Sequence, residues 1–332
     1  MGVGTTARVA VLAIDAGNSK SDVALLGADG TVLGAARGGG FQPQRVGIPA
    51  ALDVLAAVLS EAWQGARAAG VPEGAVDHVS ACLANADFPA EEEALAAAIA
   101  ERSWGRTVTV RNDTFALLRT GVDEPRGVAV VCGAGINCVG MLPDGRTARF
   151  PSIGHISGDW GGGVGLAEEA MWHAARAEDG RGAPTALARD LPAHFGLDSM
   201  HALIESIHLD RVGPGWRHEI NPILFATASN GDPTAAALVA RLADEIAVMA
   251  GVALTRLDLL DEEVTVVLGG SVLAAGHTTL NDRIAALLAE RAPKAVPRVV
   301  TAPPVLGAGL LGLDALGAPP EARALLRSAY GR

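Results

Sequence analysis

The stretch "VAVLAIDAGNSKSDVALLGADGTVLGAARGG", residues 9–39, decides the fold because its pattern occurs twice in the chain. It contains an apolar strand, a small loop with an aspartate and a lysine, a second strand, an Ala-Asp-Gly turn and a third strand. Residues 128–154, "VAVVCGAGINCVGMLPDGRTARFPSIG", repeat this order with a gap of about three residues. The repeat predicts an internal duplication that gives two similar lobes, each with a five-stranded core, facing one another across a cleft.

The rest of the pattern completes an α/β fold. In the first half, strands are predicted at 8–14, 21–26, 31–36, 76–82 and 107–111, with helices at 48–69 and 90–102. After residue 154 the pattern is mostly helical: 163–177, 184–194, 199–207, 219–229, 233–259, then a strand at 264–268 and helices at 278–290 and 305–316. We place the lobe boundary in the "GVDEPRG" stretch, which gives a first lobe at 1–122 and a second at 123–316. The last helix, about 317–332, is expected to return to the first lobe.

Composition excludes several classes of protein. The 332 residues carry a formal net charge of −11, which argues against nucleic-acid or anionic-membrane partners. No apolar run approaches the roughly 20 residues of a membrane span, and we see no signal peptide. The three cysteines (Cys82, Cys132 and Cys138) form no paired framework, so we expect a cytoplasmic protein.

Asp15 ends the first strand and is followed by Gly17, Asn18, Ser19 and Lys20, in a chain whose only other lysine is Lys294. Small residues let backbone N–H groups approach an anion, a lysine adds a cation, and a strand-end carboxylate can order hydrated Mg²⁺. The motif therefore indicates a magnesium–phosphate site. A plain hairpin turn with a local aspartate hydrogen bond is the alternative.

The matching loop of the second half contains Gly133, Ala134 and Gly135. A glycine turn between strands is often only a tight hairpin, but two such loops could hold one polyphosphate from both sides. The chain contains no G-x-x-x-x-G-K-[ST] pattern, which disfavours a P-loop nucleotide site.

Three further stretches carry polar side chains where strands end. Asp113 of "RNDTFALL" is either a helix N-cap or a general base that takes the proton of an attacking hydroxyl. "GHISGDWGGGVG", residues 154–165, places His155 and Asp159 beside glycines, as in a sugar-binding corner or a hinge. Gly269 and Gly270 follow an apolar strand, where they permit close approach of a base or ribose, or simply make a turn.

Six segments, taken in their order along the chain, resemble the N-acetylglucosamine kinase and BadF/BadG/BcrA/BcrD-type ATPase family. They are "DAGNSK", "RNDTFALL", "GAGINC", "GHISGDWGGG", "VVLGGSV" and "PPVLGAGLLGLDALG". This family lies within the actin–hexokinase–chaperone ATPase superfamily. The resemblance covers most of the chain. It implies a two-lobed, ribonuclease H-like duplication with ATP at the bottom of the interlobe cleft.

The resemblance also implies roles for single residues. Asp15 would bind Mg²⁺ through water, the loops at 16–20 and 133–136 would embrace the phosphates, and Asp113 would be the catalytic base. Asn137 and Asp159 would contact the sugar, with Gly269 and Gly270 against the adenosine. Ala134 and Ile136 stand where the family has hydroxyl residues. The family's sugar-binding asparagine after the third strand is missing, so Gln42 is its candidate replacement, and we add Asn112 and His155 to the candidate substrate contacts.

The expected activity is ATP-dependent phosphorylation of an amino sugar, N-acetylglucosamine or a glucosamine-like acceptor, to the 6-phosphate by a homodimer. Two alternatives are an ATPase that activates a radical dehydratase or reductase through a bridging iron–sulfur cluster, and a sugar- or nucleotide-binding regulator. The sugar and the hydroxyl that is phosphorylated are not fixed by the sequence.

Overall fold

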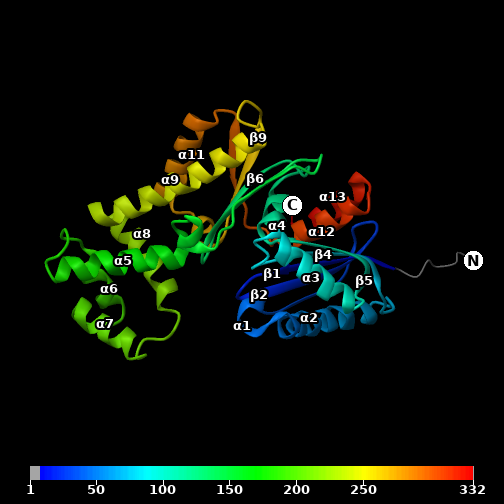
Figure 1. Ribbon diagram of the computed structural model, residues 1–332, viewed down its shortest axis with the longest axis horizontal. Helices are drawn as coiled ribbons and strands as arrows, with labels where there is room; N and C mark the ends of the chain where they lie inside the picture. The colour runs from blue at the N-terminus through cyan, green and yellow to red at the C-terminus, as the bar shows by residue number, and fades with distance from the viewer. Residues whose placement is uncertain (1–7, 332) are drawn as a thin grey trace, which may run out of the picture. The chain divides into compact units, whose positions relative to one another are not determined.

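The computed structural model describes residues 8–331, which divide into two units (Figure 1). The first unit contains the described residues up to Ala129, the segment Val139–Pro151, and the chain from Val300 onward. The second contains Val130–Cys138 and Ser152–Val299. The two stretches that share the repeated pattern each supply the first three strands of a separate five-stranded sheet.

The first sheet has the strand order β3-β2-β1-β4-β5. Its strands are β1 (Val9–Ala16), β2 (Lys20–Gly27), β3 (Val32–Gly39), β4 (Val76–Leu83) and β5 (Gly105–Asn112). β1, β2 and β3 form the predicted antiparallel meander, whereas β4 runs parallel to both β1 and β5. The carboxyl ends of β1, β4 and β5 therefore lie at one edge, where open α/β sheets place their ligands.

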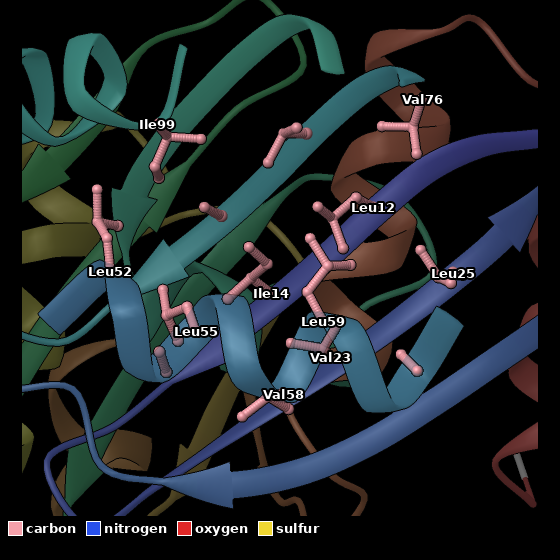
Figure 2. Packing of buried hydrophobic residues seen from close by; sticks show 14 of the residues in the cluster. Leu12, Ile14, Val23, Leu25, Leu52, Leu55, Val58, Leu59, Val76 and Ile99 are labelled. Atoms are coloured by element: carbon pink, nitrogen blue, oxygen red, sulfur yellow. The ribbon is translucent and has the colours of Figure 1, made fainter. Parts of the chain in front are cut away.

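One face of this sheet is covered by helix α2 (Ile48–Ala68), which follows the short α1 (Pro43–Val46), and by α3 (Pro89–Glu101). Leucines and valines recur on α2 every three or four residues, so one side of the helix is apolar. Figure 2 shows Leu55 and Leu59 from this side gathered with Leu12 and Ile14 of β1 in one buried cluster. Burial of each such side chain contributes about 1.5–3 kcal/mol.

The opposite face carries α4 (Thr114–Gly121), α12 (Val305–Ala315) and α13 (Pro320–Ala329). Our prediction assigned α12 to the second lobe, but in the structure it packs on β1, β4 and α4. Glycines on α12 permit this approach. A Cβ at Gly307 would lie 1.8 Å from the Ala116 carbonyl oxygen, and one at Gly312 would lie 2.4 Å from Val11.

The second sheet has the order β10-β9-β6-β7-β8, the same topology as the first. Its strands are β6 (Gly127–Cys132), β7 (Ile136–Met141), β8 (Thr147–Arg149), β9 (Val264–Gly269) and β10 (Ala295–Val299). Two five-stranded cores are thus confirmed. β10 was missed because it is a mostly exposed edge strand that contains Pro297, and proline is a signal against a strand.

Helices make up most of the second unit, as the pattern predicted. They are the 3₁₀ turn η1 (Gly154–Ser157), α5 (Gly162–Glu178), α6 (Leu187–His194), α7 (Met200–His208), α8 (Trp216–Ser229), α9 (Pro233–Arg256), α10 (Ser271–Ala274) and α11 (Thr278–Arg291). The longest, α9, packs against α5, α8 and α11. Within residues 8–331, no helix has both the length and the apolar character needed to cross a membrane.

Candidate functional site

Asp15 and Asp113 come together at the carboxyl edge of the first sheet. Asp15 is the penultimate residue of β1 and pairs in register with Cys82 of β4, while Asp113 directly follows β5. Burial raises the pKa of Asp15 well above its usual range, and the Asp113 carboxylate is the next largest cause. The Asp113 carboxylate, nearly 100 residues further along the chain, therefore acts on the pKa of Asp15.

Asp113 occupies the N-cap position of α4, but its side chain makes no capping hydrogen bond. Asn112 caps the helix instead, because its Oδ1 accepts a hydrogen bond from the Thr114 N–H at 3.0 Å. The Asn112 amide donates to Asp87 Oδ1 at 2.9 Å. Asn112, a predicted substrate contact, is thus occupied within the protein, whereas the Asp113 side chain makes no capping hydrogen bond.

The protonation behaviour of Asp113 suits a base. Burial raises its pKa to about 6, although the nearby main-chain N–H groups of Thr114 and of Asp113 itself act to lower it. A general base works best when its pKa lies near the operating pH. Because the Asp113 side chain makes no capping hydrogen bond, the alternative that it serves as a side-chain cap is not supported.

The loop at 17–20 is a hairpin turn whose Gly17 N–H donates to the Lys20 carbonyl at 2.9 Å. Two side chains hold Asn18: Gln42 Nε2 donates to its carbonyl at 2.7 Å, and Asn85 Nδ2 donates to its Oδ1 at 2.9 Å. Gln42 Oε1 accepts from Arg45, so both ends of this predicted sugar contact are bonded within the protein. Gln42 therefore holds the 17–20 loop in place through its hydrogen bond to Asn18.

Asn85 was missed by sequence reasoning. It follows β4 and adopts a positive φ of 64°, a conformation that asparagine tolerates better than most residues. The signal available in the sequence was an asparagine two residues after a buried strand in "ACLANADF". Its second hydrogen bond, to the Phe41 carbonyl at 3.2 Å, fixes the loop to the chain beyond β3.

The residues around Asp15 fit a hydrated Mg²⁺ with a phosphate. Asp15 is buried near two other carboxylates, Asp113 and Asp22, and only Lys20 and Arg37 act to lower its pKa. Lys20 and Ser19 are exposed, and Lys20 forms no ion pair with the described residues. Within residues 8–331 no cluster of three metal-ligating side chains occurs. Mg²⁺ commonly uses one or two carboxylates with water and substrate phosphates, so this set of groups is compatible with it.

In the second unit, the loop of Gly133, Ala134 and Gly135 sits on the first turn of α5. The Gly163 N–H donates to the Gly133 carbonyl at 2.7 Å, and a Cβ at Gly162 would lie 2.6 Å from Gly135. On its other side the loop is open, since a Cβ at Gly133 or Gly135 would meet no atom within 4 Å. The exposed backbone beside a helix N-terminus is a suitable surface for an anion.

His155 and Asp159 line one cavity of about 540 Å³ in the second unit, together with Ala134, Gly135 and Ser152. Asp159 Oδ2 accepts from the Gly154 N–H at 2.9 Å and from Ser157 Oγ at 2.6 Å, which closes the η1 loop. Asn137 is not among the lining residues. Its Oδ1 accepts from the Cys138 N–H and from Ser152 Oγ, so it supports the cavity wall.

Gly270, directly after β9, is required for packing. Its φ is +87°, and a Cβ there would lie 2.4 Å from the Cys132 carbonyl oxygen. This contact explains the glycine without a ligand. The predicted adenosine contact of Gly269 and Gly270 stays a prediction.

All three cysteines are buried and free. Burial raises the pKa of each thiol, that of Cys132 to about 12. Cluster ligands are thiolates, so buried thiols with raised pKa values are a poor donor set for iron and sulfur. The activator alternative gains no support from this chain's own residues.

The family model for the BadF/BadG/BcrA/BcrD ATPases matches residues 12–312. An N-acetylmuramic acid/N-acetylglucosamine kinase from Clostridium acetobutylicum is 26% identical over 166 residues, which cover 50% of this chain and 54% of the relative. An N-acetyl-D-glucosamine kinase from Dictyostelium discoideum is 26% identical over 211 residues, 62% of this chain and 65% of the relative. Each match spans less than two thirds of the curated relative's length.

The crystal structure of a candidate N-acetylglucosamine kinase from Chromobacterium violaceum has the same fold. It superimposes with a TM-score of 0.69 at 22% identity and covers 92% of this chain and 99% of that chain. The likeness confirms the expected α/β fold with two five-stranded sheets.

Proposed function

The chain belongs to the BadF/BadG/BcrA/BcrD ATPase family, and from this premise we propose that it transfers the γ-phosphoryl group of ATP to a hydroxyl of an amino sugar. The relatives named as N-acetylglucosamine kinases support an acceptor of this class, N-acetylglucosamine or a glucosamine-like sugar. One observation carries the proposal: Asn112 caps α4, which leaves Asp113 beside Asp15 with a pKa near neutrality.

In the proposed reaction, Asp113 accepts the proton of the sugar hydroxyl. The hydroxyl oxygen forms a bond to the γ-phosphorus, the bond between that phosphorus and the bridging oxygen breaks, and ADP leaves. Asp15 would hold Mg²⁺ through water, and the ion supplies charge to offset the phosphates when bound. Lys20 and the backbone of the 17–20 and 133–135 loops would bind phosphate oxygens, while Asp159 and His155 would orient the sugar.

A coupled assay of ADP release, run over a panel of sugars and with ATP alone, tests this function. We expect release that depends on an amino sugar. Rapid hydrolysis without sugar would favour an activator ATPase. Binding of sugar with no ADP release at all would favour a regulator.

We further propose that the protein works as a cytoplasmic homodimer. Val248 and Val252, one turn apart on α9, are each more than a third exposed and would suit a contact between copies. Light scattering should give about twice the 33.7 kDa chain mass, and a monomer at assay concentration would refute the dimer. Unpaired buried cysteines and the use of ATP support a reducing compartment.

A further inference from the structure

The cavity that contains His155 and Asp159 continues beyond them along one face of α5. Gly165, Glu168, Glu169 and Trp172 are three or four residues apart, so they share this face, and all four line the cavity. Gly165 leaves room at its centre, since a Cβ there would meet no atom within 4 Å. At about 540 Å³, the cavity lies within the range of pockets for drug-sized ligands and exceeds what one sugar ring needs.

The far end of the cavity is acidic and aromatic. Glu168, Glu169 and Trp172 line the cavity along α5, and the whole lining contains no lysine or arginine. Arg217 of α8 pairs with Glu168 at 2.9 Å. Glu169 accepts only a long hydrogen bond from the Trp160 indole, at 3.3 Å, and has no ion-pair partner among the described residues.

Trp172 presents an open aromatic surface at this end. Its side chain is 53% exposed, although the Arg176 guanidinium lies over the ring at 4.5 Å. Another guanidinium, that of Arg241, lies over Trp160 at 4.0 Å. Neither arginine is a lining residue, so the charged side chains that line the cavity are carboxylates, beside two indoles and His155.

From this arrangement we infer a second subsite, made of Glu168, Glu169 and Trp172, that binds a positively charged amino-sugar ring attached to the ring that is phosphorylated. An indole attracts an ammonium group and stacks on a sugar face, and an unpaired carboxylate adds charge attraction. The inference rests on the proposed function for the position of the first ring. It predicts that acceptors with a carboxylate at this end are disfavoured.

The test compares three acceptors: glucosamine, its disaccharide chitobiose, and the neutral N,N′-diacetylchitobiose. We expect the KM for chitobiose to be about tenfold below that for glucosamine, with no such gain for the acetylated disaccharide. Trp172→Ala and Glu169→Gln should each remove most of the gain while leaving kcat and KM for glucosamine unchanged. Glu290→Gln is the control, because Glu290 is an exposed glutamate of α11 that does not line the cavity.

Equal KM values for the three acceptors in the unaltered enzyme would overturn the inference, as would an equal gain for the acetylated disaccharide. Calorimetric titration with chitobiose separates this outcome from failure of the proposed function. Chitobiose binding that Trp172→Ala abolishes, without ADP release from any sugar, would keep the subsite and refute the kinase. Sugar-dependent ADP release with no chitobiose preference would support the kinase and refute the subsite.

Discussion

Replacing Asp113 with asparagine should make the protein more stable and less active at pH 8. The pKa of this carboxyl is about 6 in the folded protein and near 3.9 in an unfolded chain. The folded state therefore binds more protons than the unfolded state between about pH 4 and 6, and stability falls as the pH rises through this window. Above pH 6 the carboxyl is charged in the folded protein, so the full free-energy cost of burying that charge lowers the stability. Asparagine removes this cost because it carries no charge.

The size of the effect follows from the pKa. About two pK units correspond to about 3 kcal/mol, which is an upper value because Asp113 keeps some contact with solvent. For a unit of this size, each kcal/mol shifts the melting temperature by about 2–4 °C, so Asp113→Asn should raise it by up to about 10 °C at pH 8. The neighbouring Asp15 gains too, because the Asp113 charge that raises its pKa is gone.

Activity should move in the opposite direction. Loss of general-base assistance lowers kcat by about 10²–10⁴. In the unaltered protein, kcat/KM should decline on the acid side with an apparent pKa near 6, that of Asp113, and this limb should vanish in the variant.

The assay combines thermal unfolding at pH 5 and pH 8 with ADP release across the same range. Asp144→Asn is the control, because Asp144 is an exposed aspartate in a turn. The main-chain N–H and the side chain of Arg146 lower its pKa. This variant should raise neither the melting temperature nor the barrier to turnover. A lower melting temperature for Asp113→Asn at pH 8 would show that the carboxylate stabilises the fold, and undiminished turnover would show that it is not the base.

Three other outcomes are expected. Asn85→Ala should raise the KM for ATP about tenfold through the loss of two hydrogen bonds that hold the 17–20 loop. Asn85→Gly, which permits the positive φ, should do the same, and an unchanged KM in both would remove Asn85 from the loop's support. Gly270→Ala should lower the melting temperature far more than Gly276→Ala, because only the Cβ at position 270 would clash with a neighbouring backbone. Gly276→Ala should lose only the left-handed backbone preference, about 1–2 kcal/mol. Equal losses in the two variants would contradict the packing explanation. In the native protein at pH 8 the thiols should resist a disulfide reagent, whereas the unfolded chain should titrate three; a fast-reacting native thiol would contradict their burial.

Sequence patterns predict this fold where the signal is local. The meander and the duplication were predictable because alternating apolar residues and turn residues are local signals, and both sheets follow them. β10 was not, since an exposed edge strand with Pro297 has no buried face to create a pattern. The position of α12 was not predictable either. Its glycines allow close packing against a neighbouring helix, but in the sequence they look the same as glycines that serve a turn or a ligand.

At the candidate site, the sequence by itself determined the chemistry that is available: Asp15 and Asp113 at strand ends, one rare lysine, and two glycine loops in matching places. Only the tertiary structure decided which of the adjacent polar side chains are held in hydrogen bonds within the protein and which line the cavity. Asn112 rather than Asp113 caps α4, Gln42 braces Asn18, and α5 extends the cavity with Glu169 and Trp172. The physical reason is that burial and hydrogen-bond partners depend on chain segments far apart in sequence, which no local pattern records.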